Sequence, residues 1–308
     1  MPGPVVIGLA LDDRDAAPLA LGGVLARLSG CALALVHAYP YEPLAVPIPE
    51  YEERLRDDSL ARLRRAAAGL DTGPEVTVHA YARISAAYGL HEMAERLGAS
   101  AIVVGSSHRG RVGRVLPGSV TARLLHGAPC PVAIAPADYS GPPAGPLRIA
   151  VAYDGTPGAR EALETAVALA RGAHATVSTS TVEEPAAIAT TPMPPGWVGA
   201  REYATALHQR AEEAVAAAHS LIPDDLRGST ELDTGDPAEV LSAISTGADL
   251  LLCGSRGYGP LRSVLLGGVS SALAYSCACP LLVVPRGHSA GLGGGSPTSR
   301  MQANASAG

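Results

Sequence analysis

The fold is decided by residues 105–136, GSSHRGRVGRVLPGSVTARLLHGAPCPVAIAP, which recur as residues 254–285, GSRGYGPLRSVLLGGVSSALAYSCACPLLVVP. The two stretches align without a gap and share glycines, a Val-Leu pair and a Cys-Pro pair. Each runs from a glycine-rich loop through a short helix into an apolar strand that ends in proline. The chain therefore contains two copies of one unit.

The copies also match at their beginnings, where IGLALDD at 7–13 resembles IAVAYDG at 149–155 and places Asp12 and Asp154 at the same point. A period near 145 residues indicates tandem domains and excludes a solenoid. We expect a first domain over 1–139, a Pro/Gly linker over 140–147, a second domain over 148–286 and a disordered tail over 287–308.

Each copy alternates predicted strands and helices. In the second copy, IAVAY at 149–153 is a continuous apolar run of the kind found in strands buried on both faces. A helix follows, with apolar residues at helical spacing, and Asp236-Pro237-Ala238-Glu239 begins a later one with a capping aspartate. Alternating βα units predict an α/β fold, with a parallel sheet covered by helices on both faces.

The glycine loops follow the fourth predicted strand of each copy, and Asp12 and Asp154 follow the first. Ligands of such sheets bind beyond the carboxyl ends of the strands, at the switch point. Backbone N–H groups of a glycine loop can bind phosphate without a lysine, and a carboxylate can accept from a ribose hydroxyl or a base amine. Glycine-rich turns also occur without ligands, and acids often cap helices. Spacing alone therefore leaves nucleotide binding and a structural role both open.

The strand, the Gly-Ser-Arg-Gly loop, the nine residues before a second glycine pair and the final Cys-Pro strand resemble the universal stress protein family. The resemblance covers both copies. It implies two tandem flavodoxin-like (Rossmann-like) domains, each with a five-stranded sheet, whose last strands pair across a dimer-like interface. It also implies ATP, with or without magnesium, as the ligand, bound by the pattern Gly-x-x-Gly, nine residues, then Gly-Ser or Gly-Thr.

Each copy departs from this pattern once. In the first copy, Gly105, Gly118 and Ser119 match, but His108 replaces the second glycine and brings a side chain into the phosphate path. Such a histidine would pair with phosphate if protonated, or would block it.

In the second copy, Gly254, Gly257 and Gly267 match, and Gly268 replaces the hydroxyl residue. Gly268 keeps the backbone N–H and loses only a side-chain donor, so the second copy is the better candidate. The resemblance implies further nucleotide contacts at Asp12, Ala38, Val120, Thr121, Asp154, Thr181, Val269 and Ser270.

Composition excludes several functions. The 308 residues carry a net charge of −6, which argues against a nucleic-acid or anionic-membrane binder. All 23 basic residues are arginine, so a P-loop lysine and a Schiff-base lysine are absent from this sequence. No apolar run reaches the roughly 18 residues of a membrane span. The five cysteines lie mostly in apolar strings and indicate buried thiols of a cytoplasmic protein without a metal site.

Three functions remain in view. The first is an ATP-binding stress-response regulator, with a protein partner and pairing of domains within one chain or between two chains. The second is a nucleotide-free interaction module of the same fold. The third, an adenine-nucleotide hydrolase, needs a Ser-Gly-Gly-x-Asp-Ser loop after the first strand, where this sequence has Asp-Asp-Arg or Asp-Gly-Thr. We find no nucleophile elbow and no zinc motif, so no catalytic residue is predicted.

Overall fold

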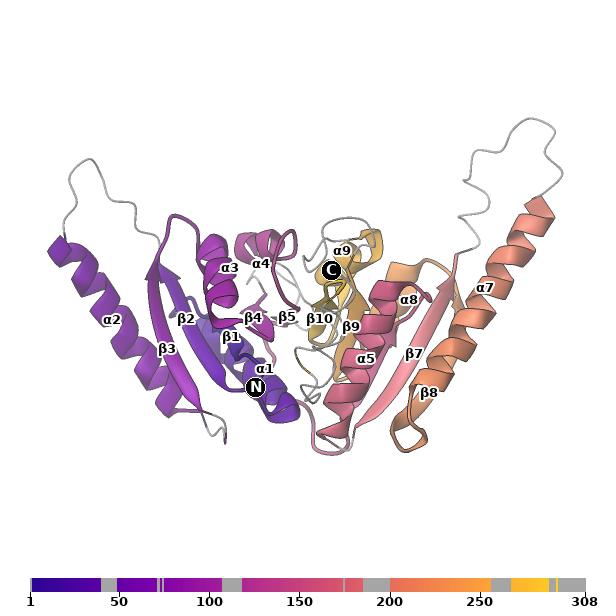
Figure 1. Cartoon of the computed structure of the whole chain (residues 1–308), viewed down its shortest axis with the longest axis horizontal. Coiled ribbons are helices and arrows are strands. Elements are labelled where there is room, and N and C mark those ends of the chain that lie inside the picture. The colour runs from indigo at the N-terminus through magenta and orange to yellow at the C-terminus, as the bar shows by residue number, and fades with distance from the viewer. Residues whose placement is uncertain are drawn as a thin grey trace, which may run out of the picture.

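Two α/β domains share one sheet in the computed structural model of the chain (Figure 1). The structure describes residues 2–39, 49–70, 73, 75–106, 118–173, 175–184, 200–255, 267–287 and 292. Figure 1 shows the domains as the two arms of a V, with the long helices α2 (Pro49–Ala68) and α7 (Ala200–Leu221) at the outer ends.

The described strands form a ten-stranded sheet in the order β3-β2-β1-β4-β5-β10-β9-β6-β7-β8. The strands of the first domain are β1 (Val5–Gly8), β2 (Leu33–Tyr39), β3 (Val76–Ala82), β4 (Ala101–Gly105) and β5 (Val132–Ala135). Those of the second domain are β6 (Arg148–Ala152), β7 (Thr176–Glu183), β8 (Arg227–Thr234), β9 (Leu250–Gly254) and β10 (Leu281–Val284). Within each domain all pairs are parallel, which confirms the predicted fold class.

The last strands of the two domains pair with each other inside one chain. Leu281 lies opposite Ile134, and Val283 lies opposite Val132, in an antiparallel ladder. Both strands are fully buried, and each also pairs in parallel with the strand before it in its own domain. The predicted pairing of PVAIAP with PLLVVP is therefore confirmed, and each domain removes the exposed edge of the other.

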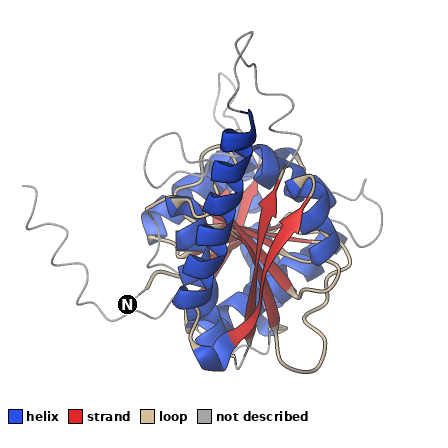
Figure 2. Ribbon diagram, turned by 90° about the vertical axis from the view of Figure 1, so that its right-hand side faces the viewer, coloured by secondary structure: helices blue, strands red, loops and turns tan. Residues whose placement is uncertain are grey.

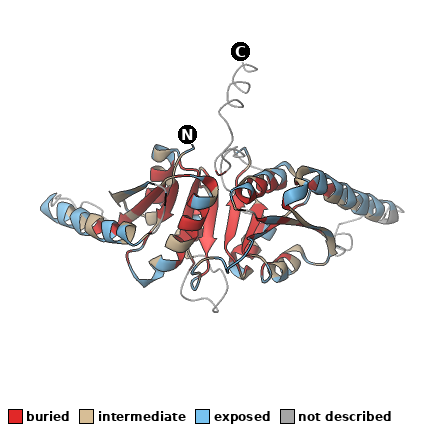
Figure 3. Ribbon diagram, turned by 90° about the horizontal axis from the view of Figure 1, so that it is seen from below, coloured by how far each residue is buried: buried red, intermediate tan, exposed pale blue. Residues whose placement is uncertain are grey.

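Helices cover both faces of the sheet, as Figure 2 shows for the second domain. One face packs against α1 (Ala16–Ser29) and α5 (Pro157–Arg171), with part of α2 and α7. The other packs against α3 (Ala86–Leu97), α4 (Ser119–Leu124), α8 (Pro237–Ile244) and α9 (Gly268–Ser276). Figure 3 shows that the buried residues gather in the central strands, whereas the outer helices are largely exposed. The crossovers therefore place the loops after β1, β4, β6 and β9 at the carboxyl edge of the sheet.

One local prediction is confirmed, and another is corrected. Asp236 caps α8 by accepting from the N–H groups of Ala238 and Glu239, at 2.9 and 3.0 Å. Gly30 ends α1 in the left-handed conformation (φ 68°), whereas Gly172 ends α5 at φ −77°. In the segment predicted to be disordered, Leu292 is 2% exposed and packs in the core, so the prediction is wrong at this residue.

The five cysteines are free thiols and are buried, as the sequence indicates. Burial raises the pKa of the Cys130 and Cys253 thiols to about 12, because a thiolate is poorly solvated there. Cys277 and Cys279 lie with their sulfurs 3.8 Å apart. Among the described residues, no group of three or more His, Cys, Asp or Glu could hold a metal ion. None of the described helices is long and apolar enough to cross a membrane.

The strand register relates the two domains residue by residue. Val5 pairs with Ala101, and Ile149 pairs with Leu250. Ala101 and Leu250 open the strands that lead to the two glycine loops, each four residues before its glycine. Val5 is therefore the counterpart of Ile149.

This register changes which residue of the first domain corresponds to Asp154. Counting along the strands from Val5 and Ile149, the counterpart of Asp154 is Ala10 and not Asp12. The next residue supports the shift, because Leu11 (φ 60°) adopts the left-handed conformation that Gly155 (φ 76°) adopts in the second domain. The prediction that Asp12 and Asp154 occupy the same point is wrong.

A short 3-10 turn at Asp13–Asp15 explains the difference. The N-cap of α1 is Asp15, five residues after Ala10, whereas the N-cap of α5 is Thr156, two residues after Asp154. The first domain thus inserts three residues between its first strand and its first helix. The run of aspartates in LALDDRD hides this insertion from a sequence comparison, because Asp12 aligns with Asp154 by residue type.

Candidate functional site

Each domain has a cleft at the carboxyl edge of the sheet. In the first domain, β1 lies between β2 and β4, and in the second β6 lies between β7 and β9, so both clefts open at a topological switch point. The first cleft has a volume of about 410 Å³ and the second about 380 Å³. Both fall within the range of small-ligand sites, which is roughly 300–1,000 Å³.

The second cleft carries Asp154 just beyond the end of β6. Its Oδ1 accepts from the backbone N–H of Thr156 at 3.0 Å and from the Thr156 hydroxyl at 2.6 Å. Thr156 in turn caps α5 by accepting from Ala159 N–H at 3.3 Å. The contacts with Thr156 hold Asp154 in place. The residue is exposed and lines the cleft, so its carboxylate is accessible to a ligand.

The start of α9 also lines the second cleft, through Gly267, Gly268, Val269 and Ser270. Ser270 Oγ accepts from Gly267 N–H at 2.9 Å, and the N-cap itself brings no side chain. A Cβ on Gly268 would meet nothing within 4 Å. The first-turn N–H groups of this nine-residue helix thus border an open space, where they can bind an anion.

Gly254 has a packing role that its place in the motif does not reveal. A Cβ on Gly254 would lie 2.6 Å from the carbonyl carbon of Gly158 and 2.9 Å from the backbone N of Ala159. The end of β9 and the start of α5 therefore touch backbone to backbone. At Gly105 a Cβ would lie 3.4 Å from Pro18 Cδ, which is an ordinary contact. The same motif glycine is thus sterically required in one domain only.

Of the two residues predicted on the second strands, one lines its cleft and the other does not. Ala38 lines the first cleft as expected, but Thr181 is buried, and its neighbours Ser180 and Val182 line the second cleft instead. Successive side chains of a strand point to opposite faces. An alignment error of one residue therefore replaces a side chain that lines the cleft with one that is buried on the other face. Ser180 Oγ donates to Asp233 Oδ2 at 2.6 Å.

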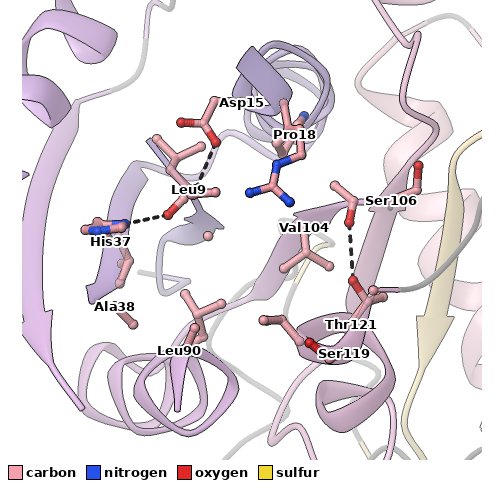
Figure 4. A pocket seen from close by; sticks show the side chains of 18 residues that line it. Leu9, Asp15, Pro18, His37, Ala38, Leu90, Val104, Ser106, Ser119 and Thr121 are labelled. Atoms are coloured by element: carbon pink, nitrogen blue, oxygen red, sulfur yellow. Dashed lines mark hydrogen bonds between the residues drawn. The ribbon is translucent and has the colours of Figure 1, made fainter. Parts of the chain in front are cut away.

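Figure 4 shows the first cleft, which is lined by Asp15 and His37 from opposite sides of Leu9. Asp15 Oδ1 accepts from Ala10 N–H at 2.8 Å. Burial raises the pKa of the Asp15 carboxyl above its usual value, against the opposing effect of that amide. His37 Nδ1 donates to the Leu9 carbonyl at 2.8 Å, which makes the histidine a structural residue of the cleft wall.

Asp12 does not line the first cleft. Both of its carboxylate oxygens accept from Arg14 Nε, at 2.9 and 2.8 Å, and Oδ1 also accepts from Arg14 N–H at 3.0 Å. Arg14 itself lines the cleft. The sequence comparison missed Arg14 and Asp15 because their turn has no counterpart in the second domain.

The glycine end of the first cleft is formed by Gly105, Gly118, Ser119, Val120 and Thr121, as predicted from the motif. Thr121 Oγ1 donates to the Gly105 carbonyl at 3.2 Å. The helix that begins there, α4, has only six residues. Gly257 and His108, which the sequence analysis singled out, lie outside the described residues.

Glu184 is a further lining residue that the motif does not indicate. It is exposed, follows the last residue of β7 and lines the second cleft together with Asp154. The described residues of the second cleft therefore include two carboxylates, whereas those of the first include an arginine and an aspartate. The two clefts share a framework and differ in charge.

Comparison with known proteins places both domains in one family. The Universal stress protein family matches residues 5–136 and 147–285. A universal stress protein of Mycobacterium tuberculosis (strain H37Rv) is 28% identical over 91% of this chain and 99% of its own. The crystal structure of a universal stress protein from Archaeoglobus fulgidus DSM 4304 has a TM-score of 0.61 at 18% identity and covers 92% of this chain and 98% of that one. A universal stress protein from Archaeoglobus fulgidus in complex with dAMP matches at 21% identity, with a TM-score of 0.31, over 43% of this chain and 97% of that one.

Proposed function

Because the chain belongs to the universal stress protein family, we propose that it is an ATP-binding stress-response regulator whose second cleft holds the nucleotide. One observation carries the proposal: Asp154 and the first turn of α9 line the same cleft at the switch point of the sheet. A carboxylate and a set of helix N–H groups complement the two polar parts of a nucleotide, its sugar hydroxyls and its phosphates.

The remaining lining residues suit the base. Ala152, Val182, Leu241 and Cys253 give the second cleft an apolar wall beside the strand ends. A planar base can pack there while the ribose meets Asp154 and the phosphates extend toward Gly268. In this arrangement Asp154 accepts from a ribose hydroxyl, and the N–H groups of Val269 and Ser270 donate to phosphate oxygens. Gly254 and Gly267 shape the backbone around them.

Asp154→Asn tests the proposal directly. Asparagine keeps the oxygen that accepts from Thr156 but loses the charge offered to the ribose. A hydrogen bond to a charged group contributes about 1.5–3 kcal/mol, so we expect binding of ATP to weaken roughly 10- to 100-fold. Isothermal titration calorimetry of the nucleotide-free protein with ATP and magnesium provides the measurement.

Asp224→Asn is the matched control, because Asp224 has a 91% exposed side chain outside the lining of the second cleft and its replacement removes the same charge. It should bind ATP as the wild type does. Equal affinities of wild type and Asp154→Asn would overturn the proposed role of Asp154. No binding of ATP by the wild type would instead favour a nucleotide-free interaction module.

Gly268→Ser should leave the fold intact and strengthen ATP binding modestly. The space around Gly268 accommodates a side chain, and serine at the start of α9 adds a hydroxyl donor beside the N–H groups. One neutral hydrogen bond contributes about 1 kcal/mol, or about fivefold in affinity. The same calorimetric titration measures the change, and a loss of binding would show that the phosphates do not lie at this helix start.

A further inference from the structure

The three-residue insertion of the first domain brings a cation into the first cleft. The turn at Asp13–Asp15 follows β1, and Arg14 within it is the one arginine among the described lining residues of this cleft. Among its described residues, the second cleft has no arginine at all. The insertion therefore gives the first cleft a phosphate-binding side chain that the second lacks.

Arg14 is held by a contact that a ligand can replace. Its guanidinium forms a two-pronged ion pair with Asp12, in which the side chains are 45% and 35% exposed. Exposed ion pairs of this kind contribute little to stability because water screens them. A phosphate group presents the same forked acceptor geometry with more charge, so it can compete with the Asp12 carboxylate for Arg14.

Asp15 supplies a carboxylate on the same wall of the cleft. One oxygen is fixed by the Ala10 N–H, and Figure 4 shows the side chain beside Leu9, at the end of β1. Ala10 is the counterpart of Asp154 and carries no carboxylate. Asp15, at the start of α1, places its carboxylate beside that strand position. The first cleft thus has a carboxylate from Asp15, where the second cleft has one from Asp154.

We propose that Arg14 of the inserted turn binds a phosphate group of a nucleotide in the first cleft, and that Asp15 accepts from a sugar hydroxyl of the same ligand. The inference rests on the proposed function, that strand-end clefts of this chain hold a nucleotide. It assigns the phosphate contact to a side chain of the inserted turn. Asp12 is then a competitor of the ligand for Arg14.

The Asp12→Asn variant shows whether Asp12 competes with the ligand for Arg14 or contacts the ligand itself, because the two roles predict opposite changes in ATP affinity. Asparagine retains the Oδ1 acceptor for the backbone N–H of Arg14 and so preserves the turn, but it removes the Oδ2 acceptor that helps to hold the guanidinium, together with a charge that repels phosphate. If Arg14 is the phosphate contact, ATP binding at the first cleft strengthens severalfold. If Asp12 were itself a ligand contact, the same variant would weaken binding.

The experiment is a set of ATP titrations by calorimetry, in the wild type and in the Asp154→Asn background, in which the second cleft binds more weakly and the first cleft can be measured separately. We expect two bound ATP per wild-type chain and at least a tenfold loss at the first cleft in Arg14→Gln. Arg56→Gln, which removes another exposed arginine paired with an aspartate, should bind as the wild type does. Unchanged melting temperatures in Arg14→Gln and Asp12→Asn would assign both effects to the ligand.

Five results would overturn the inference. Wild-type affinity in Arg14→Gln, a gain of binding in Arg14→Gln, or a loss in Asp12→Asn each contradicts a phosphate contact at Arg14. A single site that disappears in Asp154→Asn and ignores Arg14→Gln would also overturn it while leaving the proposed function in place. No ATP binding by the wild type would overturn both.

Discussion

Gly254→Ala is expected to destabilise the protein by roughly 3 kcal/mol or more, because its new Cβ would lie 2.6 Å from backbone atoms of Gly158 that cannot rotate away. The end of β9 and the start of α5 would have to separate, and both line the second cleft. Urea denaturation followed by circular dichroism gives the free energy of unfolding. ATP binding at the second cleft should fall with it.

Gly105→Ala is the matched control in the first domain. Its Cβ would lie 3.4 Å from Pro18 Cδ, so the substitution should cost less than about 1 kcal/mol. Equal effects of the two substitutions would show that the close approach of β9 and α5 is not what requires glycine at position 254. A larger effect in the first domain would contradict the account of both loops.

Leu282→Asp should destabilise the protein even more, because Leu282 is fully buried in β10 and lies opposite Ala133 of β5. An unpaired carboxylate there costs roughly 4 kcal/mol or more, unless it is protonated or the strands part. Since the ladder between β5 and β10 joins the domains, we expect loss of the folded chain or separation of its two halves. Thermal unfolding and limited proteolysis measure the two outcomes.

Tyr275→Asp places the same charge on α9, at a residue that is 53% exposed, and should change stability little. If Leu282→Asp unfolded no more easily than Tyr275→Asp, the antiparallel contact would contribute nothing to the fold. The comparison therefore tests the continuous sheet without reference to any ligand.

The architecture could be predicted from sequence because its signals are repeated and long. Apolar runs such as IAVAY, helices with regular apolar spacing and a capping aspartate at Asp236 occur in order, and each agrees with the next. The pairing of the last strands was implied by the family resemblance, and it fits two short apolar segments ending in proline, which need cover at an edge. These features depend on local pattern, which one sequence shows fully.

The details of the clefts could not be predicted with equal success, since they depend on single-residue register. Three aspartates near the first strand offered Asp12 as the match for Asp154, but a turn of three residues shifts the strand and leaves Ala10 there. Thr181 lies one residue from the cleft lining and is buried. The steric need for Gly254 arises from Gly158, almost a hundred residues earlier in the chain, and no local pattern reveals it.

The central claim, that strand-end clefts of this chain hold adenine nucleotide, is tested most directly by native mass spectrometry of the purified chain with added ATP. We expect intact complexes at the mass of the chain plus bound ATP, and a smaller bound fraction in Asp154→Asn, because the second cleft should bind ATP roughly 10- to 100-fold more weakly in that variant. A spectrum that contains only the free chain, at ATP concentrations well above the micromolar range, would contradict it.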